Sequence, residues 1–334
     1  MVPIRACVDK IRISEWDVVR LEAHPLQVDV VPGKGGDILS VRWLPSDIDL
    51  LWTSPWGLRR KGATSMATDS VSRFLESYPG GWQSIFPNGG DACVDDGVEH
   101  GFHGEACLAS WQVERVFAEP EQAGVVMSAL LERSNFFMTK QITVEQGSVV
   151  IVESARNLSA HSREVMWSHH PAFGPPFLSE DCIVGADARR FVVDDERDTP
   201  AGDLPPGSIS KWPHAAAKTG GIVDLGSIPA GPSDRFGYLT DFEAPRMWIR
   251  NPSLGLVAEI TWDLSVFPYA WFWLEKNATV GYPWFGDAFV LGLEPASSYP
   301  GQGIVNVRRK TTNLLRFAEG ETKTAEVRLT VSQL

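Results

Sequence analysis

The sequence predicts an all-β protein, a large antiparallel β-sandwich with few short helices. Three observations lead to this fold class. The 334 residues include 30 glycines and 23 prolines, many of which punctuate short apolar runs. Several of these runs alternate polar and apolar residues, as strands with one solvated face do. No segment of 15 or more residues carries a convincing helical stripe of apolar residues.

The clearest strands lie in the middle of the chain. The runs Val125–Glu132, Phe136–Glu145 and Ser148–Ala155 are rich in β-forming residues and are separated by short breaks. Gln146-Gly147 connects the last two, with glycine where a positive φ is needed, which predicts a tight hairpin. Near the C-terminus, Thr324–Val331 alternates just as cleanly and predicts a closing strand.

A different pattern occurs at Ala288–Leu293, which is nearly all apolar and therefore predicts a strand covered on both faces. Pro295 lacks the N–H that a β-ladder needs, so we expect it to end this strand. Long segments rich in proline and glycine are expected to be loops; they are Ser54–Thr68, Tyr78–Gly104 and Asp194–Gly231. No internal repeat or composition break divides the chain, so a single domain over residues 1–334 is expected.

Charge and composition limit the partners. The formal net charge of −12 disfavours nucleic acid and anionic membrane surfaces. No window approaches 18 uncharged apolar residues, and Met1–Trp16 lacks the apolar core of a signal peptide. The four cysteines show no C-x-x-C spacing, which favours free thiols in a reduced, cytoplasmic setting. The sequence does not indicate an oligomeric state.

The first group of residues with possible chemistry lies in the segments Phe86–Asp91 and Glu99–Glu105. The first segment contains Asn88 in Phe-Pro-Asn-Gly-Gly-Asp. The second contains His100 and His103, and a glycine follows each histidine. Glycine lets the backbone bend so that an imidazole can point into a cleft. A polar surface loop explains the same residues equally well.

A second group is Met166-Trp167-Ser168-His169-His170. If this segment is a strand, neighbouring side chains point to opposite faces, so His169 and His170 cannot both line one site. Trp167 would then share a face with His169. A buried, hydrogen-bonded structural histidine is the alternative for either residue.

Glu294 is the third candidate, because it emerges from the most apolar strand of the chain. Burial raises the pKa of a carboxyl group and is costly unless a partner or a function offsets it. Glu294 is thus a candidate general base, with a structural ion pair as the alternative.

Some of the 13 tryptophans are candidate binding residues. In Trp271-Phe272-Trp273-Leu274-Glu275, strand geometry places Trp271, Trp273 and Glu275 on one face. Two indoles beside a carboxylate suit a sugar, which has apolar C–H faces and hydroxyl edges. Core filling is the alternative for each indole. Trp82, Trp167 and Trp284 also lie in or near the candidate segments.

In this order, the motifs resemble the aldose 1-epimerase (galactose mutarotase-like) superfamily. The matching residues are His103-Gly104, then Asn157-Leu158-Ser159 leading to His170-Pro171-Ala172-Phe173, then Glu294-Pro295. The run Gly80–Pro87, which starts with two glycines and contains Trp82, resembles hexose-phosphate epimerase-like members. The similarity covers about residues 25–332.

The resemblance implies a twisted β-sandwich with a sugar site on its concave face. It implies that His170 is the general acid that protonates the ring oxygen and that Glu294 is the general base for the anomeric hydroxyl. His103 would orient the sugar. Independently of the resemblance, Asn88, Trp82 and Trp273 are further candidate binding residues from their segments. No metal or organic cofactor is implied, and the partner is a small carbohydrate.

The chain departs from the family in two places. It has no clear counterpart of the family's arginine in a G-R element, for which Arg73 is the nearest candidate. Asp241 is the candidate for the sugar-binding aspartate. Arg59-Arg60-Lys61 could instead meet a phosphate or acid group on the substrate, so the kind of sugar stays open.

The leading hypothesis is therefore an aldose 1-epimerase-like isomerase. A non-catalytic carbohydrate-binding β-sandwich is the first alternative. A metal-dependent sugar isomerase of the cupin type, with His100, His103 and Glu105 as ligands, is the second. The H-x-x-H-x-E spacing departs from the H-x-H pattern of cupins, which disfavours it.

Overall fold

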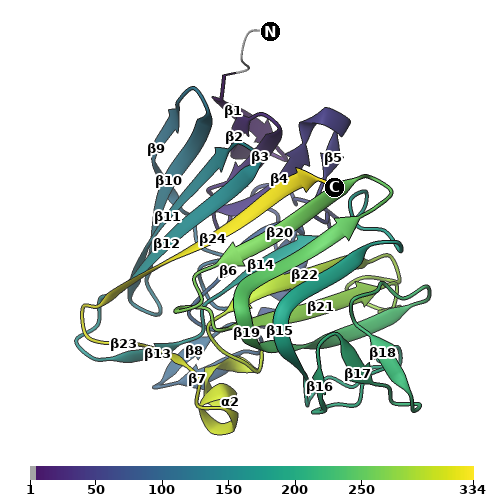
Figure 1. Cartoon of the computed structure of the whole chain (residues 1–334). Helices are drawn as coiled ribbons and strands as arrows, with labels where there is room; N and C mark the ends of the chain where they lie inside the picture. Colours follow the sequence, from purple (N-terminus) through teal and green to yellow (C-terminus); the bar gives the residue numbers. More distant parts are fainter. Residues whose placement is uncertain (1–4) are drawn as a thin grey trace.

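Strands form most of the chain (Figure 1), which a computed structural model describes over residues 5–334. Residues 1–4, the start of the N-terminal segment considered above, lie outside the described residues. The strands before residue 120 are β1 (Cys7–Ile13), β2 (Trp16–Ala23), β3 (Leu26–Val31), β4 (Asp37–Trp43), β5 (Ile48–Asp49), β6 (Trp82–Ile85), β7 (Cys93–Asp95), β8 (Val98–His100) and β9 (Gln112–Ala118). The next are β10 (Gln122–Leu131), β11 (Phe136–Glu145), β12 (Ser148–Asn157), β13 (Arg163–Val165), β14 (Ser168–Phe173), β15 (Ile183–Val193), β16 (Ile209–Lys211), β17 (His214–Ala216) and β18 (Ile222–Asp224). The last are β19 (Ser233–Asn251), β20 (Leu256–Trp262), β21 (Tyr269–Lys276), β22 (Phe289–Ala296), β23 (Leu315–Phe317) and β24 (Thr322–Gln333).

Eighteen of these strands form one antiparallel sheet that folds back on itself as two layers. One layer runs in the order β9-β10-β11-β12-β24-β20 and the other in the order β1-β2-β3-β4-β6-β14-β22-β21. Strands β15 and β19 belong to both layers. Apolar side chains from the two inner faces, such as Val28, Ile142 and Leu329, form one continuous core. The predicted all-β sandwich is confirmed.

The two layers are joined where β19 bends. Its first half, 233–239, pairs with β21, and its second half, 246–251, pairs with β20. Asp241 lies between the halves with a φ of 58°, and the neighbouring strand β15 shifts register between Ala186 and Ala188. A positive φ and a bulge both sharpen the turn of a strand, so this corner carries the chain from one layer to the other.

The strands expected in the middle and at the end of the chain are confirmed as β10, β11, β12 and β24. Gly147 has a φ of 84° in the tight turn between β11 and β12. The apolar run at Ala288 becomes β22, which lies between β21 and β14 and is buried along almost its whole length.

Two expectations are wrong. Pro295 does not end β22, which continues to Ala296; the ladder to β14 is interrupted between Ala296 and Gly292, so the missing N–H of Pro295 falls in that gap. The expected loops Tyr78–Gly104 and Asp194–Gly231 are not loop throughout: the first contains β6, β7 and β8, and the second contains β16, β17 and β18. Strand β6 pairs with β4 and β14. Four strand residues between two glycine-rich stretches give too short a pattern to be recognised.

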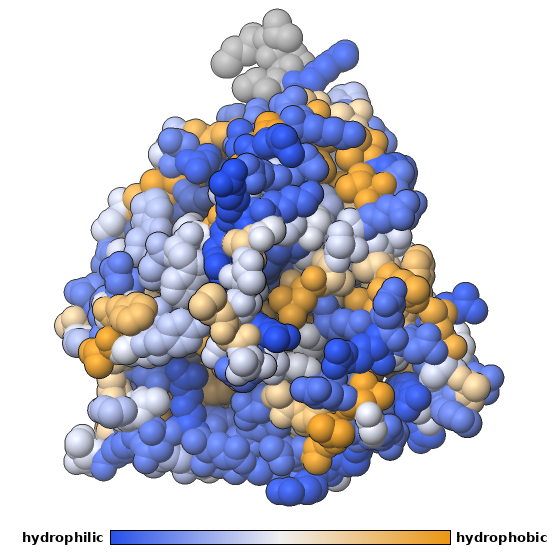
Figure 2. Space-filling model, turned by 180° about the vertical axis from the view of Figure 1, so that it is seen from behind, coloured by the Kyte–Doolittle hydropathy of each residue, from blue (hydrophilic) through white to orange (hydrophobic). Residues whose placement is uncertain are grey.

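The two helices, α1 (Ser70–Ser77) and α2 (Gly303–Lys310), have eight residues each, and a single 3₁₀ turn covers Leu44–Ser46. Asp69 caps α1 by accepting a hydrogen bond from the Ser72 N–H at 2.8 Å. Helix α2 packs beside β7 at the bottom of Figure 1. Figure 2 shows a mostly hydrophilic face with scattered apolar side chains, in keeping with the acidic composition. None of the helices in residues 5–334 has the length and apolar character needed to cross a membrane.

Candidate active site

His169 and His170 lie on opposite faces of β14, as strand alternation predicts. The backbone of His170 pairs with Gln83 of β6, and its side chain lines a cavity. His169 points into the core of the sandwich, where its Nδ1 accepts a hydrogen bond from Trp82 Nε1 at 3.1 Å. One face of β14 thus presents His170 to the cavity, and the other face presents His169 to the core.

Below the site, His169 belongs to a buried group of charged residues centred on Glu153 of β12. Glu153 lies 3.2 Å from Lys140 Nζ and 3.5 Å from His169 Nε2, and it accepts a hydrogen bond from Trp167. Burial opposes ionisation of Glu153, but Lys140, His169 and hydrogen bonds outweigh it and lower its pKa. Burial lowers the pKa of His169 to about 4, so the ion pair is formed by Lys140.

Lys140→Met is therefore expected to destabilise the fold strongly. It leaves the Glu153 carboxylate buried without its cation, which typically costs about 3–5 kcal/mol of unfolding free energy. Urea unfolding followed by tryptophan fluorescence measures this loss. Arg189→Met, which breaks an exposed ion pair with Glu243, is the matched control and should leave stability nearly unchanged. Equal stability of the two variants would contradict a charged Glu153.

Glu294 reaches the same cavity from β22. Only 1% of the residue is exposed, and its Oε2 has no hydrogen-bond partner among the described residues. Gly292, two residues earlier on the same face, leaves the necessary room, because a Cβ there would lie 2.4 Å from Glu294 Oε1. A buried carboxyl group with a free oxygen, facing a cavity, is poised to bind a polar ligand.

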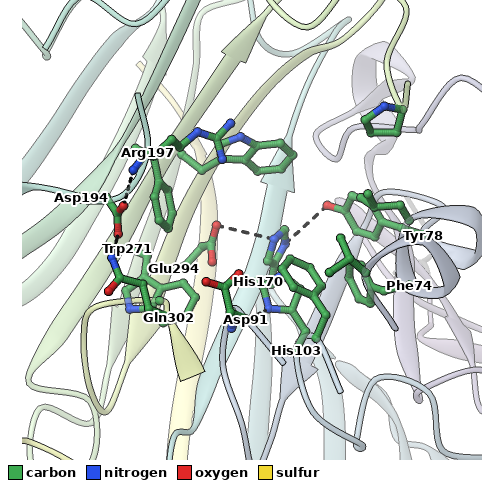
Figure 3. Close-up of a pocket in the computed structure, with 18 of the residues that line it drawn as sticks. Phe74, Tyr78, Asp91, His103, His170, Asp194, Arg197, Trp271, Glu294 and Gln302 are labelled. Carbon is green, nitrogen blue, oxygen red and sulfur yellow. Dashed lines mark hydrogen bonds and ion pairs between the residues drawn. The ribbon is translucent and has the colours of Figure 1, made fainter. Parts of the chain in front are cut away.

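His170 and Glu294 face each other across this cavity (Figure 3). His170 Nε2 lies 3.7 Å from Glu294 Oε1, and the hydroxyl of Tyr78 lies 3.4 Å from His170 Nδ1. Burial lowers the pKa of His170 to about 4 and raises the pKa of Glu294 well above its ordinary value. Burial thus disfavours the charged form of both groups, so a proton shared by the pair resides preferentially on Glu294 in the absence of a ligand.

His103 completes the group of titratable side chains. Its backbone adopts the left-handed conformation, with a φ of 59°, and its ring centre lies 5.5 Å from that of His170. Burial, reinforced by His170, lowers the pKa of His103 well below its ordinary value, so the ring is neutral. Its Nδ1 accepts a hydrogen bond from the Gly90 N–H at 3.1 Å, which leaves Nε2–H as a donor.

The cavity has a volume of about 450 Å³ and an aromatic wall. Trp271 and Trp273 of β21 line it together, as predicted from their alternation, and Trp284 lines it from the following loop. Trp284 stacks on Trp56 with ring centres 5.5 Å apart. Glu275, on the same face of β21, accepts hydrogen bonds from Ala278 and Thr279 and so holds the start of this loop. Flat indoles of this kind suit the apolar face of a sugar ring.

The cavity also has polar lining residues, all of them outside the residues chosen from the sequence: Asp91, Asp194, Glu196, Arg197 and Gln302. Asp91 stands in the Phe86–Asp91 motif, so that motif carried a usable signal. Asp194 begins a long segment whose sequence has no pattern, and only the tertiary fold brings it to the cavity.

Four residues predicted to bind the sugar do not line the cavity. Arg73 is exposed on α1, where its Nε donates to the Ala67 carbonyl at 3.1 Å, and Asp241 pairs with Arg190 at the corner of β19. Asn88 is fully buried; it donates to the carbonyls of Asp91 and Gly101 and accepts from the Ile304 N–H. Trp82 lies in the sandwich core beside His169.

The three residues considered for a cupin-type metal site do not face one space. His103 lines the cavity, whereas His100 lines a separate surface cleft. Glu105 accepts hydrogen bonds from the backbone N–H groups of Arg133 and Ser134. The site is thus an aromatic cavity with one histidine–glutamate pair.

The fold is similar to that of solved galactose mutarotase-like proteins. The structure is similar to that of a galactose mutarotase-like protein from Clostridium acetobutylicum, with a TM-score of 0.71, 16% identity, and 99% of each chain covered. A protein from Synechocystis matches with a TM-score of 0.68 at 15% identity, covering 100% of this chain and 98% of that one. A galactose mutarotase related enzyme from Lactobacillus acidophilus matches with a TM-score of 0.61 at 14% identity, covering 95% and 97%.

The sequence family is narrower than the fold. A family model described as a domain of unknown function, DUF4432, matches residues 15–331, and the chain belongs to this family. No curated protein matches the chain.

Proposed function

We propose that this protein is an aldose 1-epimerase-like isomerase that interconverts the anomers of a sugar. The observation that carries the proposal is the His170–Glu294 pair, with 3.7 Å between Nε2 and Oε1, buried in a cavity lined by tryptophan. Opening a cyclic sugar needs one group that gives a proton and one that takes a proton, close to the same ring. The mutarotase-like fold supports this assignment.

The reaction follows from moving two protons. Glu294 takes the proton of the anomeric hydroxyl as the C1–O1 bond becomes a carbonyl, and the bond between C1 and the ring oxygen breaks. His170 gives a proton to that ring oxygen. After rotation about C1–C2, the ring oxygen attacks the other face of C1, and both protons return. His103 Nε2–H is placed to donate a hydrogen bond to the sugar.

The cycle starts and ends with the proton of the pair on His170, so the number of protons on the pair is conserved. In the free protein the proton favours Glu294, since burial raises the pKa of its carboxyl group and lowers that of His170. The proton is transferred to His170, 3.7 Å away, when the sugar occupies the cavity. The form with one proton on the pair is thus the active one.

Activity is expected to have a broad, bell-shaped dependence on pH. Below about pH 4, His170 and Glu294 are both protonated, so the pair has no base and activity falls. As the pH rises through the raised pKa of Glu294, the pair loses its proton and no acid remains. Tyr78 and His103 also face His170. The pKa of Tyr78 is raised and that of His103 is lowered, so both side chains are neutral at neutral pH. The measurement is kcat/KM against pH, with unfolding followed in parallel; activity that stays unchanged as the pH falls through about 4, with the fold intact, would contradict the assignment.

The experiment that tests the function is exchange NMR on a panel of monosaccharides. The protein should increase the rate of exchange between the α and β anomeric signals above that of a protein-free blank. Binding of sugars without faster exchange would favour the alternative, a carbohydrate-binding β-sandwich that lacks turnover.

A further inference from the structure

The charges that line the cavity are mostly negative. Among the described residues, its lining includes the carboxyl groups of Asp91, Asp194, Glu196 and Glu294, against the guanidinium of Arg197. The imidazoles of His103 and His170 are neutral at pH 7, because burial lowers their pKa. The net charge of these lining groups is therefore negative, and it stays negative when Glu294 is protonated.

Most of these groups already have partners within the fold. The carboxylate of Asp194 accepts hydrogen bonds from Tyr238 and from Gln302 Nε2, and from the N–H groups of two following residues. Glu196 pairs with Lys310 at 2.7 Å. Arg197 pairs with the buried Asp234 at 2.8 Å, so its charge is already compensated.

Asp91 is the exception. Its side chain is exposed to solvent where it lines the cavity, and no donor from residues 5–334 lies within hydrogen-bonding distance of its carboxylate. Its backbone is fixed, because Asn88 donates to the Asp91 carbonyl at 2.9 Å. The preceding residue, Gly90, is held by His103 and by a bridge to Gln302. Figure 3 shows the Asp91 side chain in the cavity with Glu294 and His170. Partial burial, Glu196 and Asp194 raise the pKa of Asp91, and a ligand that donates hydrogen bonds would relieve these effects.

The basic residues that could have met an anionic sugar lie elsewhere. Arg59 pairs with Glu76, Arg60 pairs with Glu15, and Lys61 lies over the ring of Trp16. None of them lines the cavity, and neither does Arg73. A phosphate or carboxylate on the sugar would thus enter the cavity without a free cation to receive it.

We propose that Asp91 determines the substrate class: it binds a hydrogen-bond donor of the sugar, a hydroxyl or an ammonium group, and the site rejects sugars that carry a phosphate or carboxylate. This inference rests on the proposed function, since it concerns the same cavity. Asp91 has this role because its carboxylate lines the same cavity as the His170–Glu294 pair and has no hydrogen-bond partner among residues 5–334, so it is free to accept from a ligand.

The test compares four sugars that share one ring: D-glucose, D-glucosamine, D-glucuronate and D-glucose 6-phosphate. Blank-corrected anomer exchange with the wild-type protein should favour the first two over the two anions by about tenfold or more in kcat/KM. Binding of the same four sugars is measured in parallel by saturation-transfer NMR, which requires no turnover.

Asp91→Asn keeps the size of the side chain and removes its charge. It should lower kcat/KM for the preferred sugars and reduce the discrimination against the anions by about tenfold. A loss confined to D-glucosamine identifies ammonium as the donor, whereas an equal loss for D-glucose identifies a hydroxyl. Glu132→Gln, which removes one exposed negative charge away from the cavity, is the control and should leave the discrimination unchanged.

The outcomes separate this inference from the proposed function. Exchange of all four sugars at equal rates, unaffected by Asp91→Asn, would overturn the role of Asp91 and leave the function standing. Binding that favours D-glucose or D-glucosamine without any exchange would overturn the function and support the selection by charge. Failure of the wild-type protein to bind either preferred sugar would overturn both.

Discussion

Glu294→Gln is expected to slow protein-dependent anomer exchange by about 10²–10⁴-fold, the usual contribution of a positioned acid or base. The amide has the size of the carboxyl group but cannot exchange a proton with the anomeric hydroxyl. Because Glu294 is buried and its Oε2 has no partner, the uncharged amide should preserve the fold. The effect should appear in kcat, measured by exchange NMR at saturating sugar.

The matched control is Glu259→Gln on β20, a half-exposed carboxylate whose neighbour is Arg246. This variant should exchange anomers at the wild-type rate. Thermal unfolding of both variants separates lost chemistry from lost structure. Near-wild-type exchange in Glu294→Gln, with the fold intact, would remove Glu294 from the mechanism.

The second large effect distinguishes two adjacent histidines. His170→Asn should reduce exchange by about 10²–10⁴-fold, because it removes the proton carrier that faces Glu294. His169→Asn should retain exchange but lower stability by about 1–3 kcal/mol, because Trp82 Nε1 loses its buried acceptor. Anomer exchange and urea unfolding of both variants measure the two effects.

The opposite pattern is the contradicting result. If His169→Asn abolished exchange and His170→Asn spared it, the chemistry would lie on the core face of β14 instead of in the cavity. The two substitutions are chemically identical and one position apart, so each serves as the control for the other.

Much of the fold could be predicted from local patterns. Alternation over β11 and β24, the Gln146-Gly147 turn and the apolar run of β22 each depend on residues close together in sequence. Strand β6 could not be predicted, because its four residues are buried on both faces and owe their structure to β4 and β14. The pattern of a strand this short is set by its partners.

The same distinction holds for the candidate site. His170, Glu294, Trp271 and Trp273 lie on regular strands, so alternation could assign their faces. Asp91, Asp194 and Arg197 reach the cavity from irregular segments, where no periodicity relates position to direction.

Arg73 and Asp241 were predicted to bind the sugar because of their residue types, but neither lines the cavity. An arginine near the site in sequence lies on the outer face of α1, and an aspartate lies at the corner of β19. Their chemistry suits a sugar, but chemistry alone does not place a side chain.

The alternation of β14 has a consequence for how this segment can evolve. One strand supplies the cavity with His170 and the buried Lys140–Glu153 group with His169. Deleting or inserting a single residue before Ser168 would exchange the two faces, sending each histidine into the other's surroundings. Point substitutions can change one face at a time, whereas length changes alter both together. Natural variation in length should therefore collect in turns and loops and spare the stretch from Met166 to Phe173.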